Sequence, residues 1–238
     1  MKNKISAIIT AAGKGERMNS SVKKQFMLLA GKPIVIHTIE KFLKADIFYK
    51  ILVTLNPEDM QFARKLFFNE YKFPQNKFII VNGGETRQQS VLNALEVSPS
   101  DRDIVVIHDG VRPFVKVEEI KEIVDIVYEK SAVSYGLPVK NTIKSVTHNE
   151  VVNTLPREYL WEIFTPQAFR FQIIYDAHQQ SLDTGFFAND DAELVEKIGV
   201  PVFVLEGSPE NIKITDKFDL KIAEAIMSKN MNSTQKRR

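Results

Sequence analysis

The sequence predicts an α/β fold in which helices cover both faces of a mostly parallel, twisted sheet. Strand and helix patterns alternate four times over about 135 residues, which is typical of such sheets. The predicted strands are short runs of β-branched and apolar residues, as expected when both faces of a strand are buried. Three of them run directly into glycine-bearing junctions, which places candidate binding loops at one edge of the sheet.

In the N-terminal half of the chain, local residue patterns predict each strand and helix. Pro33 begins one helix, and Asn56, followed by two acidic residues, is placed as the N-cap of the next. The predicted strands are Ile5–Thr10, Tyr49–Leu55, Phe78–Val81, Ile104–Ile107 and Ala132–Val139. The helices between them are predicted at Ile34–Leu43, Asn56–Glu70, Glu85–Leu95 and Val117–Glu129.

The second half begins with a polar and β-branched alternation over about 140–157, which predicts a projecting β-hairpin arm. A lone hairpin is marginal in water, so we expect this arm to pack on a second subunit. Helices are predicted at Trp161–Phe164, Phe169–Ser181, Asp191–Ile198 and Asp216–Met227, with a strand at Val202–Leu205. No linker divides residues 1–228, which we interpret as a single domain, and the polar tail 229–238 is expected to be disordered.

The composition narrows the class of function. Hydrophobic residues make up 44% of the 238 residues and charged residues 26%, which is ordinary for a globular protein. The 32 basic and 30 acidic residues nearly balance, and no basic patch with interleaved aromatics occurs, so we expect no nucleic-acid partner. Cysteine is absent, which excludes disulfides and thiolate chemistry. No stretch approaches the roughly 20 apolar residues of a membrane span, and a cytoplasmic protein without a membrane partner is expected.

The first glycine-bearing junction, Ala11–Arg17, combines features of an anion site. Gly13 and Gly15 let main-chain N–H groups approach a phosphate, and Lys14, Arg17, Lys23 and Lys24 add positive charge. Met18 breaks the dinucleotide fingerprint GxGxxG, and the GxxxxGK[ST] motif is missing. An ordinary strand-to-helix turn with a solvated loop remains the alternative.

Two further junctions, Gly83–Ser90 and His108–Pro113, lie at predicted strand ends and should share a cleft with the first. Gly83 and Gly84 allow the backbone to approach a flat base, and the Ser90 hydroxyl can form a hydrogen bond. Asp109 is placed where a metal-proximal or hydroxyl-binding carboxylate would lie, although it could simply cap a loop.

The remaining candidates could also have purely structural roles. Arg112 suits an anion, yet could be a surface arginine, and Lys213 could be an exposed residue of a short strand over 211–215. His108 is expected to pack inside its strand, and the four histidines lack zinc-ligand spacing. No nucleophile triad is recognisable in the sequence. In-line substitution at phosphorus, where positioning and cationic charge supply most of the rate, is therefore the favoured chemistry.

An ordered set of motifs resembles the bacterial 2-C-methyl-D-erythritol 4-phosphate cytidylyltransferases over about Ile5 to Met227. These motifs are Ala11–Met18, Lys24–Phe26, Gly83–Arg87 with Ser90, His108–Pro113, Pro138–Ile143, Thr165–Phe169 and Asn211–Thr215. The resemblance implies a Rossmann-like nucleotidyltransferase fold, Mg²⁺ held mainly by the phosphates of CTP, and a homodimer that exchanges β-arms. It further implies joining of CTP to 2-C-methyl-D-erythritol 4-phosphate, a polyol phosphate, with release of pyrophosphate, in non-mevalonate isoprenoid synthesis.

The resemblance also implies roles residue by residue. Arg17 and Lys24 match the two cations that stabilise the pentavalent transition state. The nucleotide-binding positions are Ala11, Ala12, Gly13, Lys14, Gly15, Gly84, Glu85, Ser90 and Asp109. The sugar-phosphate positions are Asp109, Arg112, Thr142, Arg157, Thr165 and Lys213, with Thr142 and Arg157 on the arm and so expected to reach the partner's site.

Four departures from the family pattern bear on these roles. Lys23 replaces a usual proline, so that either adjacent lysine could reach the phosphate, and Glu85 and Asn141 each replace a common aspartate. Asn189-Asp190-Asp191 replaces a more usual Thr-Asp-Glu. Ribitol-5-phosphate cytidylyltransferase, similar in fold and nucleotide loop, is the rival within the superfamily. The sequence is also compatible with a non-catalytic CTP-binding protein and with an enzyme that uses another nucleoside triphosphate.

Overall fold

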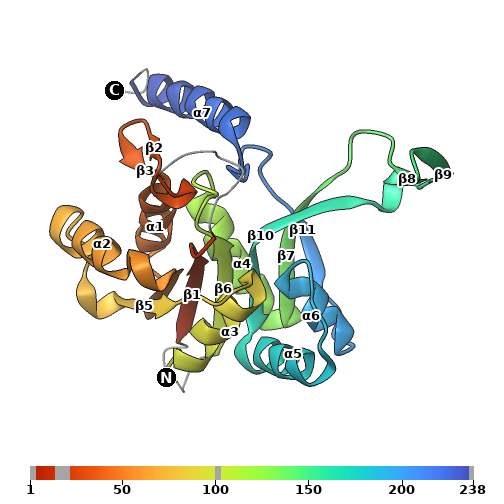
Figure 1. Cartoon of the computed structure of the whole chain (residues 1–238), viewed down its shortest axis with the longest axis horizontal. Helices are drawn as coiled ribbons and strands as arrows, with labels where there is room; N and C mark the ends of the chain where they lie inside the picture. The colour runs from red at the N-terminus through yellow and green to blue at the C-terminus, as the bar shows by residue number, and fades with distance from the viewer. Residues whose placement is uncertain (1–3, 14–21, 100–102, 236–238) are drawn as a thin grey trace.

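The structure of the chain, a computed structural model, describes residues 4–13, 22–99 and 103–235, with side chains up to residue 230. A seven-stranded sheet runs through the middle of the molecule (Figure 1), in the order β11-β7-β10-β6-β1-β4-β5. Only β10 runs antiparallel to its neighbours, so the expected mostly parallel sheet is confirmed. The strands are β1 (Ile5–Thr10), β4 (Lys50–Leu55), β5 (Phe78–Asn82), β6 (Ile104–Asp109), β7 (Ala132–Pro138), β10 (Trp161–Arg170) and β11 (Phe203–Glu206).

Helices cover both faces because successive strand residues point to opposite sides. In β1, Ala7 and Ile9 pack in one apolar cluster, whereas Ile8 packs in another. The first cluster lies under α1 (Ile34–Ala45), α2 (Met60–Arg64, continued by a π-helical turn Lys65–Glu70) and α4 (Val117–Lys130). The second lies under α3 (Arg87–Val97), α5 (Phe171–Thr184) and α6 (Asp191–Lys197).

The last helix, α7 (Lys217–Gln235), covers a third and smaller apolar cluster. Leu29 of β2 (Leu28–Leu29) and Ile34, next to β3 (Lys32–Pro33), belong to this cluster together with Ala223 of α7. Because α7 continues to Gln235, residues 229–235 are helical, contrary to the expected disordered tail, and 236–238 lie outside the described residues. In the described part of the chain, no helix is long and apolar enough to span a bilayer.

Two further predictions of secondary structure were wrong. Trp161–Phe164 is not a helix but the start of β10, whose backbone pairs with β7 from Trp161↔Pro138 onward. Its later residues pair with both β6 and β7, so that α5 begins only at Phe171. Residues 211–215 form no strand; Ile214 N–H donates to the Val111 carbonyl at 3.0 Å as a single loop contact.

The projecting arm is present as predicted. Strands β8 (Lys144–Thr147) and β9 (Glu150–Thr154) pair antiparallel around His148 and Asn149, whose φ angles of 51° and 65° suit a tight hairpin turn. The arm extends well away from the sheet (Figure 1). Its valines Val146, Val151 and Val152 are between 54% and 66% exposed, an apolar surface that the single chain leaves uncovered.

Candidate active site

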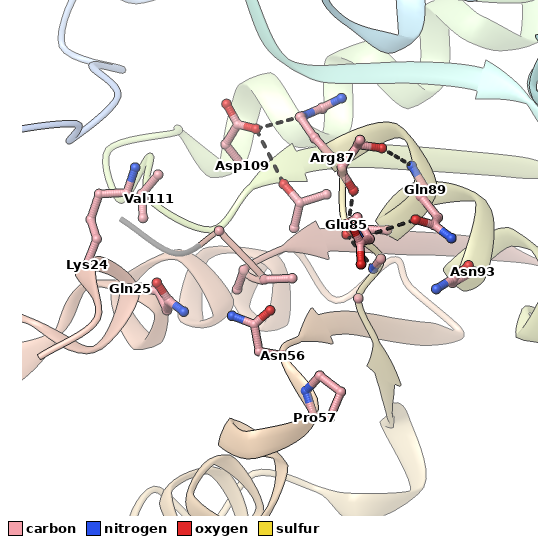
Figure 2. A pocket seen from close by; sticks show the side chains of 18 of the residues that line it. Lys24, Gln25, Asn56, Pro57, Glu85, Arg87, Gln89, Asn93, Asp109 and Val111 are labelled. Atoms are coloured by element: carbon pink, nitrogen blue, oxygen red, sulfur yellow. Dashed lines mark hydrogen bonds and ion pairs between the residues drawn. The ribbon is translucent and has the colours of Figure 1, made fainter. Parts of the chain in front are cut away.

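A cavity of about 750 Å³ lies at the carboxyl ends of β1, β4, β5 and β6 (Figure 2). The expected convergence of three strand-end junctions is thus confirmed for their described residues. The site also includes Asn56 and Pro57, at the end of β4, which sequence reasoning did not assign to it. The lining is formed by residues 10–13, 24–25, 56–57, 83–87, 89–90, 93, 109, 111 and 213.

Backbone hydrogen bonds hold the strand ends together. Ala11 N–H donates to the Thr54 carbonyl at 3.0 Å, and Gly83 N–H donates to the Leu55 carbonyl at 2.7 Å. A Cβ atom on Gly83 would lie 2.3 Å from the Cβ of Ala12, so that glycine is required for the two junctions to approach this closely. The floor of the cavity is consequently made of small residues and backbone.

The Gly83–Ser90 junction is organised from within. Thr86 caps α3 by accepting a hydrogen bond from Gln89 N–H at 3.0 Å. The Ser90 hydroxyl accepts from Gly84 N–H at 3.0 Å and donates to the Thr86 carbonyl at 2.9 Å. Ser90 therefore shapes the loop, and its proton is already used there; Glu85 is exposed on the rim.

The two adjacent lysines point to different surroundings. Lys24 lines the cavity (Figure 2), whereas the Lys23 ammonium pairs with the carboxylates of Glu58 and Asp59. The uncertainty over which lysine faces the cavity is resolved in favour of Lys24. Lys14, Gly15 and Arg17 of the first junction lie outside the described residues, so their predicted roles stay predictions.

Asp109 is the centre of a charged cluster at the end of β6. Its Oδ2 accepts from Arg112 Nε at 3.2 Å and from Lys213 Nζ at 2.9 Å, and its backbone N–H donates to the Thr165 hydroxyl at 3.0 Å. The structure thus brings together four of the six predicted sugar-phosphate residues. Burial disfavours the charged form of Asp109, yet Arg87, Lys213 and Arg112 hold the pKa of its carboxyl well below 3.8, so that it stays ionised.

Arg87 joins this cluster to a second buried carboxylate. Its Nε donates to Asp109 Oδ1 at 3.2 Å (Figure 2), and its Nη1 donates to Asp191 Oδ2 at 2.7 Å. Burial opposes the charge of Arg87, but Asp191 and Asp109 raise its pKa above the ordinary value. Burial likewise opposes the charge of Asp191, but Arg87 lowers the pKa of this carboxyl below its ordinary value. His178 Nε2 lies 3.4 Å from the other Asp191 oxygen without forming a hydrogen bond.

Sequence reasoning gave Arg87 no role, and it noted Asp191 only as part of Asn189-Asp190-Asp191, a departure from the family pattern at the phosphate end of the pocket. Arg87 lies within the Gly83–Arg87 motif, which was the available signal, but its partner Asp191 is 104 residues away. The prediction for His108 is confirmed: it is fully buried in β6 beside the Phe42 ring, and burial lowers its pKa to about 4.

Thr142 and Arg157 are not brought into the cavity within one chain. Both are exposed near the base of the arm, and Arg157 donates from Nη1 to the Lys140 carbonyl at 3.1 Å. Their predicted contact with sugar phosphate therefore depends on a second chain and stays a prediction.

This arrangement favours transfer chemistry at phosphorus. Small residues offer room and backbone for a nucleoside, Lys24 and Lys213 supply positive charge on the same cavity, and Asp109 is held ionised beside them. Fold and site together define a Rossmann-like α/β nucleotidyltransferase.

The comparisons with known proteins give the family. The model of the family "IspD: 2-C-methyl-D-erythritol 4-phosphate cytidylyltransferase" matches residues 5–229, and the chain belongs to this family. A 2-C-methyl-D-erythritol 4-phosphate cytidylyltransferase of Caldanaerobacter subterraneus is 42% identical over 227 residues, covering 94% of this chain and 99% of the relative. Its counterpart in Clostridioides difficile is 43% identical over 223 residues, covering 94% and 93%.

Solved structures agree with this assignment. The 4-diphosphocytidyl-2C-methyl-D-erythritol synthase of Anaerococcus prevotii superposes with a TM-score of 0.84 at 29% identity, over 95% of this chain and 97% of that one. The Francisella tularensis 2-C-methyl-D-erythritol 4-phosphate cytidylyltransferase gives a TM-score of 0.78 at 32% identity, over 93% and 98%. The resemblance inferred from the ordered motifs is confirmed.

Proposed function

We propose that this chain transfers the cytidylyl group of CTP to 2-C-methyl-D-erythritol 4-phosphate, a step of isoprenoid biosynthesis. A phosphate oxygen of the acceptor attacks the α-phosphorus of CTP, a new P–O bond forms, and the bond to the β-phosphate oxygen breaks to release pyrophosphate. The observation that carries the proposal is one cavity bounded by the glycine junctions, Lys24, Asp109 and Lys213, in a chain of this family.

Each described residue has a physical task in this reaction. The small surfaces of Ala11, Ala12 and Gly84 admit the nucleoside, and Lys24 neutralises charge that develops at the α-phosphate. Lys213, which lines the cavity, and Arg112, which shares the Asp109 carboxylate with it, would bind the acceptor's phosphate and hold it in line. Arg17 would act with Lys24 as the second transition-state cation.

Mg²⁺ is proposed as a companion of the CTP phosphates. Among the described residues, no group of three or more acidic or histidine side chains could hold a metal, and the Asp109 oxygens already accept from Arg87, Arg112 and Lys213. Mg²⁺ commonly combines one or two carboxylates with substrate phosphates, so this site suits a metal that arrives with the nucleotide. When bound, the ion would neutralise the leaving pyrophosphate.

We also propose a homodimer in which the arm of one chain completes the site of the other. The exposed valines of the arm, with Trp161 and Ile163 of β10 at 38% and 39% exposure, offer apolar surface for a second copy. Arg157 and Thr142 would then reach the partner's acceptor site. The cytoplasmic location expected from the sequence stays a prediction, which cell fractionation would test.

Pyrophosphate release tests the reaction directly. We expect release when the protein is incubated with CTP, Mg²⁺ and 2-C-methyl-D-erythritol 4-phosphate, and a much lower rate with ribitol 5-phosphate or with ATP, GTP or UTP. Faster turnover of ribitol 5-phosphate would identify the rival enzyme. CTP binding without release from either acceptor would leave a non-catalytic CTP-binding protein.

A further inference from the structure

Lys23 and Lys24 are neighbours in the chain but have separate surroundings. The backbone at Lys23 is extended, with φ −62° and ψ 140°, and a 3₁₀ turn begins at Lys24. The backbone thus changes conformation between the two residues, and only one of the two side chains lines the cavity. That side chain belongs to Lys24.

The Lys23 side chain is bound to the start of the helical segment after β4. Its Nζ lies 2.8 Å from Asp59 Oδ2 and also contacts the Glu58 carboxylate. The Lys23 and Asp59 side chains are only 24% and 13% exposed, so solvent screens their ion pair less than one at the open surface, while Glu58 is 73% exposed. Burial opposes the charge of Lys23, but hydrogen bonds to Asp59 and Glu58 raise its pKa above 10.5 and keep it charged at neutral pH.

A second contact binds the same segment on the other side of Lys24. The Phe26 ring meets the Phe62 ring of α2 edge to face, with centroids 5.0 Å apart. Between the two contacts, Phe26 N–H donates to the Lys23 carbonyl at 2.9 Å and closes the turn. Lys24 is therefore held between an ionic and an aromatic contact with one short stretch, residues 58–62.

We infer that Lys23 is a positioning residue for the transfer reaction, and that its ion pair with Asp59 fixes the backbone from which Lys24 reaches the α-phosphate. This inference rests on the proposed function. The two lysines then have different tasks, although they have the same charge: Lys24 acts on the phosphate, and Lys23 acts through Lys24. Asn56 and Pro57, which directly precede residues 58–62, line the same cavity, so the partners of Lys23 adjoin the wall of the site.

A double-mutant cycle tests the inference with Lys23→Ala, Asp59→Asn and the two combined. Loss of either partner should lower kcat about threefold to tenfold, the range for a charge-assisted contact, while the Kd of CTP from calorimetry changes less than about twofold. Lys23→Ala removes the ion pairs with both Asp59 and Glu58, and Asp59→Asn removes the less exposed of the two, so the double variant should be no slower than Lys23→Ala alone. Lys65→Ala, an exposed lysine on the π-helical turn, controls for the lost charge and should match the parent.

A direct contact between Lys23 and the phosphate predicts different kcat values for these variants. If Lys23 itself contacted the phosphate, Asp59→Asn would leave kcat unchanged or raise it, Lys23→Ala alone would be slow, and the inference would be wrong. Unchanged kcat in Lys23→Ala would refute it equally. An inactive parent protein would instead refute the proposed function, which separates the two failures, and thermal unfolding of each variant identifies a loss that comes only from misfolding.

Discussion

Replacing Arg87 by methionine tests the charged cluster that orders the site. The substitution keeps an unbranched side chain but removes the guanidinium between Asp109 and Asp191, whose side chains are 6% and 1% exposed. Removing one partner of a buried ion pair costs about 3–5 kcal/mol. The cost should be somewhat smaller here, because the Arg87 side chain is 27% exposed and Asp109 keeps its ion pairs with Arg112 and Lys213. We therefore expect a loss of about 2–4 kcal/mol in the free energy of unfolding.

The loss should depend on pH with a defined sign. The pKa values of Asp109 and Asp191 are lowered in the folded chain below 3.8, so the stability they contribute is present above that value and is lost as pH falls through the folded values. The difference in the free energy of unfolding between the parent and Arg87→Met should be largest at about pH 7 and become smaller below about pH 4.

Urea unfolding followed by circular dichroism, at one fixed chain concentration, measures this difference. Arg64→Met, at an exposed arginine of α2, is the matched control and should change the unfolding free energy by less than about 0.5 kcal/mol. Arg87→Lys should fall between parent and Arg87→Met, since one ammonium cannot bridge both carboxylates as the fork does. A loss below about 1 kcal/mol for Arg87→Met at neutral pH, or an equal loss at all pH values, would refute the reasoning.

Four other substitutions test the remaining parts of the site. Lys24→Ala should lower kcat, measured by stopped flow, about 10²-fold to 10³-fold while weakening CTP binding, measured by calorimetry, much less. Equal losses in the two measurements would contradict the role of Lys24 at the transition state. Arg17→Ala should have the same effects. Gly83→Ala should destabilise the fold by about 1–3 kcal/mol, because the new Cβ would lie 2.3 Å from that of Ala12, and parent-like unfolding would show that the junctions can separate. Arg157→Ala mixed with Lys24→Ala should regain part of the activity in heterodimers; a mixture as inactive as its components argues against a shared site.

The sequence was informative where local pattern decides structure. Buried strands such as Ile104–Asp109 are apolar runs that need both faces covered, and the turn at His148 and Asn149 follows from residues that tolerate positive φ. Trp161–Phe164 was predicted wrongly because a short apolar run suits either a strand or a helix, and here the pairing with β7 decides.

The ionic contacts of the site could not be predicted, because they join distant residues. Arg87 and Asp191 are 104 positions apart, and Lys23 and Asp59 are 36 apart, so no spacing rule connects them. Asp109 was predicted as a site residue because it lies beside Gly110 at the carboxyl end of a strand, where ligands bind in open α/β sheets. Which of two adjacent lysines faces the cavity depended on a partner that only the folded chain brings near.

A crystal structure with CTP and Mg²⁺ would show whether the nucleotide binds in the cavity beside Lys24. We expect cytosine against Ala12 and the Gly83–Ser90 junction, with the α-phosphate within hydrogen-bond reach of Lys24 and with Lys23 still paired with Asp59. CTP bound outside this cavity, or a Lys24 side chain directed away from the phosphates, would contradict this expectation.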